Sequence, residues 1–108
     1  MHFPVKDGKV KDILSGGQYS EKVRNILSNY ENADNIEALG IGISHIVPFP
    51  IYGTRRDGAR IGTAHVALGR NNDIGGETLS DVHMDALMDK VTVELDGNRV
   101  LNNGVLLI

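Results

Sequence analysis

Two histidines and one aspartate carry the most distinctive chemistry in this sequence. His83 and Asp85 form a His-x-Asp pair, and His65 precedes them in the apolar stretch 63–69. Residues two apart on a β-strand point to the same face, so His83 and Asp85 would project together, about 7 Å apart along the backbone. Two imidazoles and one carboxylate suit Zn²⁺, Co²⁺, Mn²⁺ or Fe²⁺ and leave coordination positions open. We therefore expect a divalent metal site formed by His65, His83 and Asp85.

The same segment also fits a purely structural role. Asp81, His83 and Asp85 alternate with Val82 and Met84, which is the pattern of an antiparallel strand with one face in solvent. A single histidine in an apolar strand is commonly a structural residue. The pattern alone leaves both interpretations open.

Composition narrows the class of protein. A chain of 108 residues is the size of one domain, and we expect residues 1–108 to form a single domain. The net charge is −3 and basic residues form no block, so nucleic acid is not an expected partner. The sequence has no Cys, which excludes disulfides and thiolate zinc sites. It also lacks a signal-peptide core and a membrane-spanning apolar run, so we expect a cytoplasmic protein and no membrane partner.

Two elements near the N-terminus have clear local signals. Residues 3–13 read as a hairpin, because Asp7-Gly8 favours a turn with positive φ between two short strands. Residues 20–30 read as a helix, with Ser20 as the expected N-cap. Its apolar residues recur at helical spacing and form one stripe: Val23, Ile26, Leu27 and Tyr30.

The remaining chain is expected to form short strands. We predict strands over 36–43, 60–68, 81–88 and 91–95, then a turn at 96–98 and one or two strands in 99–107. A loop is predicted where Pro48 and Pro50 are followed by Gly53 to Gly58, and a second loop is predicted over the polar segment 69–80. The connections are too short for helical crossovers, so the fold class is α+β: a mixed, mainly antiparallel sheet with one main helix.

Several stretches together resemble a known family. They are Ile36 to Ile43, Gly62 to Gly69, the Gly75-Gly76 loop, Ser80 to Asp85 and Thr92 to Gly97. In this order they resemble the C-terminal part of the thermophilic metalloaminopeptidases, also called aminopeptidase T or leucyl aminopeptidase-like proteins. The resemblance runs from about Phe3 to the end of the chain.

This resemblance implies a two-metal site holding zinc or cobalt, in a cleft between two domains of a dimeric exopeptidase. His65 is similar to the family's first histidine ligand, and His83 and Asp85 are similar to its closing His-x-Asp pair. The implied activity is hydrolysis of N-terminal peptide bonds of a peptide substrate. The implied partners are a second copy of the chain and an N-terminal domain that this sequence lacks.

Two positions depart from the family pattern. The family's glutamate ligand before the hydrophobic-Gly-Ile-Gly run corresponds to Ala38, and the nearest carboxylate is one residue earlier, at Glu37. A shift of one residue turns a strand side chain to the opposite face, so Glu37 is expected to point away from the ligands unless a bulge intervenes. The family's tyrosine near the metals corresponds to Asn72.

Three hypotheses follow. The first is a metal-dependent aminopeptidase domain, whose water nucleophile is activated at the metal. The second is a mononuclear non-haem iron dioxygenase-like domain, because two His and one carboxylate also suit Fe²⁺. The third is a non-catalytic remnant that folds and dimerises, which follows from Ala38, Asn72 and the missing N-terminal half. Whether the isolated chain is an enzyme is left open by the sequence.

Overall fold

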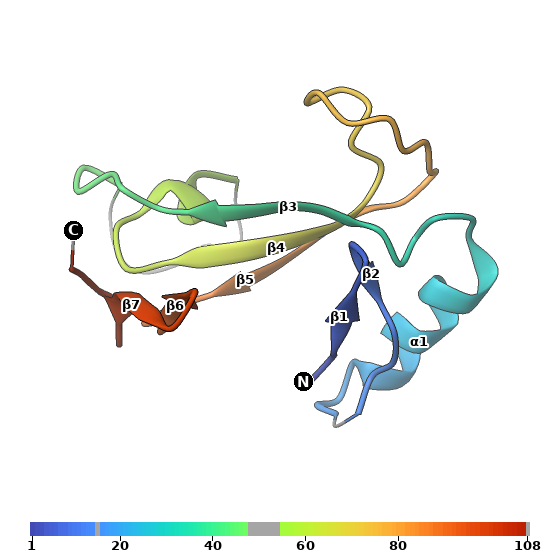
Figure 1. Ribbon diagram of the computed structural model, residues 1–108, viewed down its shortest axis with the longest axis horizontal. Coiled ribbons are helices and arrows are strands. Elements are labelled where there is room, and N and C mark those ends of the chain that lie inside the picture. Colours follow the sequence, from blue (N-terminus) through green and yellow to red (C-terminus); the bar gives the residue numbers. More distant parts are fainter. Residues whose placement is uncertain (15, 48–54, 108) are drawn as a thin grey trace. The chain divides into compact units, whose positions relative to one another are not determined.

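A computed structural model describes residues 1–14, 16–47 and 55–107 of the chain (Figure 1). The elements within these ranges are, in chain order, β1 (Val5–Lys6), β2 (Lys9–Val10), α1 (Ser20–Asn29), β3 (Ile36–Ile41), the 3₁₀ helix η1 (Arg55–Ala59), β4 (Ala64–Gly69), β5 (His83–Met88), β6 (Val93–Leu95), β7 (Asn98–Asn102) and β8 (Val105–Leu106). Pro48, Pro50 and Gly53 of the predicted loop lie outside the described residues.

The described strands form three small sheets rather than one. Their orders are β1-β2, β3-β4-β5 and β6-β7-β8. The pairs β1–β2, β6–β7 and β7–β8 are antiparallel, and one isolated bridge, Ser44 to Arg60, is parallel. The α+β class with mainly antiparallel pairing is therefore confirmed.

The chain divides into two compact units. Unit 1 comprises Met1–Ala38 and Ala67–Asp85, and unit 2 comprises Leu39–Val66 and Ala86–Ile108. The strands β3, β4 and β5 each contribute residues to both units. Within the described ranges, no helix combines the length and the apolar character that a membrane crossing requires.

Unit 1 begins with the predicted hairpin. Val5 pairs with Val10 and Lys6 with Lys9. The turn between them has φ of 53° at Asp7 and 75° at Gly8, the positive values that a two-residue type I′ turn requires. The Ile36 N–H donates to the Gly8 carbonyl at 2.7 Å, which joins the hairpin to the start of β3.

Helix α1 confirms the predicted range to within one residue, but its start differs from the prediction. The N-cap is Tyr19, with φ −102° and ψ 0°, and no side chain of the described residues makes a capping hydrogen bond there. Ser20 is already helical, because it lies within the first helical turn, which the Val23 N–H closes by donating to the Tyr19 carbonyl at 3.0 Å. The apolar stripe of α1 is only half-buried within the described residues, and Tyr30 remains 51% exposed.

The predicted loop before β5 is compact and is organised by Asn71. The Asn71 carbonyl accepts from the Ile74 and Gly76 N–H groups, and its side-chain oxygen accepts from the Thr78 N–H at 3.0 Å. Further along, the Val82 carbonyl accepts from the Arg70 N–H at 3.0 Å. These bonds fix the chain immediately before His83.

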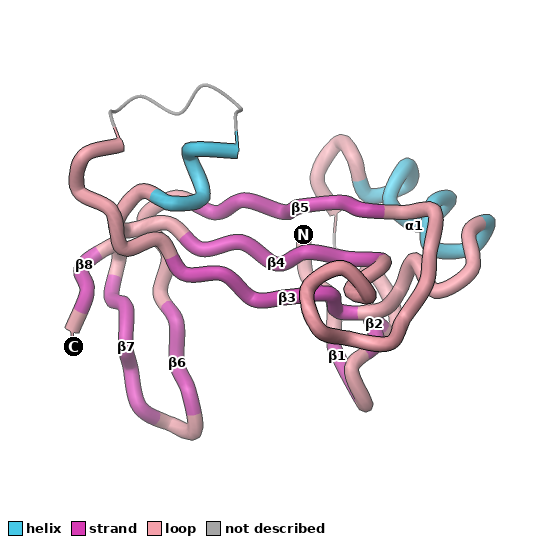
Figure 2. The backbone as a smooth tube through the Cα atoms, turned by 90° about the horizontal axis from the view of Figure 1, so that it is seen from above, coloured by secondary structure: helices cyan, strands magenta, loops and turns pink. Residues whose placement is uncertain are grey.

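Unit 2 contains the meander β6-β7-β8 (Figure 2). Leu101 of β7 is fully buried. The turns at Asp96-Gly97 and Asn103-Gly104 both have positive φ at each central residue, as two-residue hairpins require. The first of these turns was predicted from the sequence.

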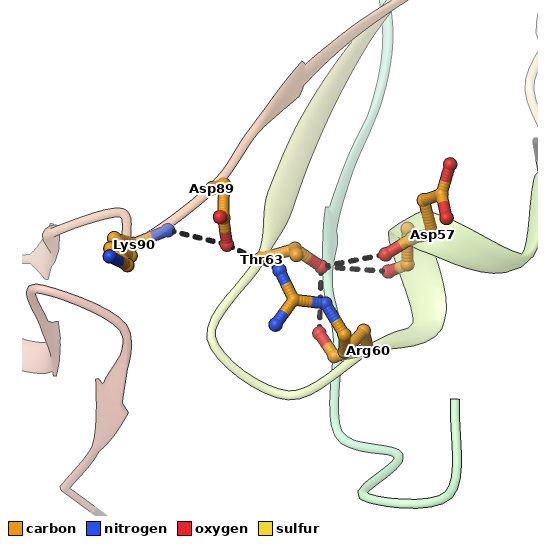
Figure 3. Close-up of polar contacts among 6 residues, drawn as sticks. Asp57, Arg60, Thr63, Asp89 and Lys90 are labelled. Carbon is orange, nitrogen blue, oxygen red and sulfur yellow. Dashed lines mark hydrogen bonds and ion pairs between the residues drawn. The ribbon is translucent and has the colours of Figure 1, made fainter. Parts of the chain in front are cut away.

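A second buried point in unit 2 is Thr63, which is 0% exposed. Its hydroxyl lies 2.7 Å from the Arg60 carbonyl and 3.2 Å from the Asp57 carbonyl, so it satisfies backbone groups at the end of η1 (Figure 3). The Arg60 guanidinium donates to the Asp89 carboxylate at 2.6 Å, and that carboxylate also accepts from the Lys90 N–H. This network ties the end of η1 to the end of β5.

Candidate metal centre

His83 and Asp85 lie two residues apart on β5, as predicted, and their side chains come together. The Nε2 atom of His83 lies 3.7 Å from the Oδ2 atom of Asp85. The two side chains are 41% and 46% exposed, so both remain accessible to solvent. Alternation along a regular strand explains why they share a face.

The other nitrogen of His83 has a partner that the sequence reasoning missed. Its Nδ1 atom lies 2.7 Å from the Oε2 atom of Glu37 on β3. The Glu37 side chain is only 6% exposed. The one-residue shift from Ala38 predicted that Glu37 points away from the ligand residues, and this is wrong for His83.

A signal for this contact was present in the sequence. Glu37 is the sole charged residue in the otherwise apolar and glycine-containing run 36–43. A carboxylate that is taken out of water needs a hydrogen-bond donor or a cation, because the isolated charge is costly to bury. The sequence alone did not identify His83 as that donor, because the contact depends on which strands lie side by side.

His65 lies on β4, in unit 2, where its ring packs on backbone. A Cβ atom added to Gly40 would come within 2.0 Å of the ring, and one added to Gly58 would lie 3.2 Å from Nδ1. The missing side chains of these two glycines therefore make the space that the imidazole fills. The buried Nδ1 atom has no hydrogen-bond partner among the described residues.

The predicted ligands thus fall into two groups. His83 and Asp85 belong to unit 1 and approach each other, whereas His65 belongs to unit 2. Convergence of all three on one ion stays a prediction. Within the described part of the chain, no group of three or more His, Asp or Glu side chains is arranged to hold a metal ion.

The two positions that depart from the resembled metalloaminopeptidase pattern also have defined surroundings. Ala38 is a half-buried residue of β3. Asn72 lines an open cavity of about 370 Å³ in unit 1, together with Arg70, Ser80 and Asp81. One of its lining residues, Asp81, stands two residues before His83, the first residue of β5.

The donor chemistry of His83 and Asp85 is compatible with a divalent cation. Two ligands that each stand about 2.0–2.1 Å from a tetrahedral zinc ion are about 3.4 Å apart. The observed 3.7 Å between Nε2 and Oδ2 is close to this value. The Oε2 atom of Glu37 engages the other nitrogen of the ring. The pair could therefore supply two ligands, and the rest of a coordination sphere would need other groups.

Comparisons of this chain with protein-family models, with curated proteins and with solved structures return no match.

Proposed function

We propose that this chain is a metal-binding domain of the metalloaminopeptidase type, with His83 and Asp85 as ligands of a divalent cation. The observation that carries the proposal is the approach of His83 Nε2 to Asp85 Oδ2 at 3.7 Å. Little movement is needed to bring both atoms to bonding distance of zinc or cobalt. The sequence motifs around the two residues supply the second line of support.

The residues around the pair suit a binding site. Both ligands are partly exposed, so a substrate can reach the same position. The N-terminal end of β5 is held by backbone hydrogen bonds such as Arg70 N–H to the Val82 carbonyl, so the pair stands on a fixed segment. His65 is proposed as a further ligand on the strength of the family motif alone.

A bound divalent cation supplies Lewis-acid chemistry, which polarises a peptide carbonyl and lowers the pKa of a water molecule. His83 and Asp85 would hold and orient that cation, and the Asp85 carboxylate would offset one of its two positive charges, whereas the neutral His83 ring would add no charge. The proposed substrate is a peptide with a free N-terminus. The remaining ligands are proposed to come from a preceding domain or a second copy of the chain. A cytoplasmic location is part of the same proposal.

The test is metal binding by protein purified without chelators. Elemental analysis should find zinc or cobalt, and calorimetric titration with each ion should give a defined stoichiometry. His83→Ala and Asp85→Asn should each weaken binding by more than tenfold. His45→Ala is the matched control, because His45 is an exposed histidine outside the site.

Metal binding and two activity assays together separate the competing hypotheses. Iron binding under anaerobic conditions, with oxygen uptake on a hydroxylated aromatic, would favour the dioxygenase-like function instead. Hydrolysis of aminoacyl nitroanilides by the metal-loaded protein would favour the peptidase. Metal content that is unchanged in His83→Ala would overturn the proposal.

A further inference from the structure

We propose that Glu37 is a positioning residue for His83, which fixes the imidazole so that only Nε2 faces the cation. The effect of Glu37 on metal affinity rests on the proposed function, whereas the hydrogen bond between Glu37 and His83 does not depend on it. Glu37 corresponds to none of the ligands that the sequence motifs suggest. It is the one buried carboxylate that contacts a candidate ligand in the described part of unit 1.

The first step concerns the proton on the ring. A neutral imidazole carries one N–H, and an ionised carboxylate has only acceptor atoms. At 2.7 Å, Glu37 Oε2 therefore accepts from Nδ1 of His83. The hydrogen is thus held on Nδ1, and Nε2 carries the free lone pair.

The second step concerns direction. A metal-binding histidine must offer an unprotonated nitrogen, and its other nitrogen commonly donates to a carboxylate that fixes the ring. In His83 the free nitrogen is the one that faces Asp85, at 3.7 Å. The Glu37 contact and the Asp85 approach therefore use opposite edges of one ring, as an oriented ligand requires.

The third step concerns why Glu37, and not Asp85, holds the ring. The Glu37 side chain is 6% exposed, whereas that of Asp85 is 46% exposed. A buried carboxylate loses most of its hydration, so it depends on its hydrogen bond to His83. At 3.7 Å, Asp85 lies beyond a normal hydrogen bond and stays available to a cation.

The experiment measures the His83 tautomer and the zinc affinity in the same set of variants, at a pH where the ring is neutral. In the metal-free wild type, ¹⁵N NMR of the imidazoles should show His83 with its hydrogen on Nδ1. In Glu37→Met, which keeps the length but loses the acceptor, the hydrogen should redistribute toward Nε2. Zinc affinity should then fall by about 10- to 100-fold, the usual effect of losing such a partner.

Two further variants separate positioning from a general loss of structure. Glu37→Gln retains an acceptor oxygen, so it should largely restore the Nδ1–H tautomer and most of the zinc affinity. Glu77→Met changes an exposed glutamate of unit 1 and should alter neither. Circular dichroism of every variant checks that the fold is retained, and the Gln variant decides the matter if Glu37→Met unfolds.

The outcomes distinguish this inference from the proposed function. An Nε2–H tautomer in the wild type, or a tautomer and affinity that are unchanged in Glu37→Met, would overturn the role of Glu37. Absence of zinc binding with the expected tautomer shift would overturn the metal function and leave the hydrogen-bond assignment standing. If Glu37→Gln behaves as Glu37→Met does, charge rather than ring orientation is what Glu37 supplies, and the inference fails.

Discussion

Replacing Gly40 by alanine tests the position of the His65 ring. A Cβ atom at this position would lie 2.0 Å from Cε1 and 2.5 Å from Nε2 of His65. Ordinary contacts of a Cβ atom begin near 3.4 Å, so the ring must shift or change rotamer. Forcing extra atoms into a packed region costs about 1–3 kcal/mol. We therefore expect Gly40→Ala to lower the free energy of unfolding by about 2 kcal/mol.

A double-mutant cycle assigns this cost to the ring. In a His65→Ala background the imidazole is gone, so adding Gly40→Ala should cost close to nothing, and the coupling energy should be about 2 kcal/mol. Urea unfolding followed by circular dichroism measures all four proteins. Gly17→Ala is the control, because a Cβ atom at Gly17 meets nothing within 4 Å. An equal cost of Gly40→Ala in both backgrounds would refute the placement of His65 over Gly40.

Three further predictions concern stability and use the same unfolding assay. Leu101→Ala should cost about 3 kcal/mol because Leu101 is fully buried, while Leu107→Ala, at a 52% exposed position, should cost less than about 1 kcal/mol. Thr63→Val should cost about 1–3 kcal/mol because it removes the hydrogen bond that the buried hydroxyl makes to the carbonyls at the end of η1, and Thr63→Ser should recover most of that loss. Gly97→Ala should cost about 1 kcal/mol because φ at Gly97 is 79°, a cost that Gly17→Ala should not share.

The position of Glu37 changes how the ligand set is understood. The metalloaminopeptidase pattern that the sequence resembles has a carboxylate at the position of Ala38. In the proposed site Glu37 would not replace that ligand, because its Oε2 atom contacts Nδ1 of His83 and the cation is proposed to bind at Nε2. On this proposal, Glu37 serves orientation rather than coordination. A comparison of zinc affinity tests this difference: Glu37→Gln should keep most of the affinity, whereas Asp85→Asn should lose more than tenfold.

Local signals in the sequence determined the turns and the helix. Asp7-Gly8 and Asp96-Gly97 take positive φ because glycine has no Cβ and aspartate tolerates that region, so the turn type follows from two residues. The spacing of apolar residues in α1 similarly fixed a helix over 20–30, observed as Ser20–Asn29. The proximity of His83 and Asp85 also followed from strand alternation alone.

Contacts between distant segments were decided only by the tertiary structure. Strand periodicity gives the face of a residue relative to its own neighbours, but it does not say which strand lies beside it or in which register. Glu37 and His83 are 46 residues apart, and their hydrogen bond depends on that register. The packing of the His65 ring of β4 against Gly40 of β3 depends on it too. The sequence thus determined which side chains can do chemistry, and the pairing of strands decided which of them meet.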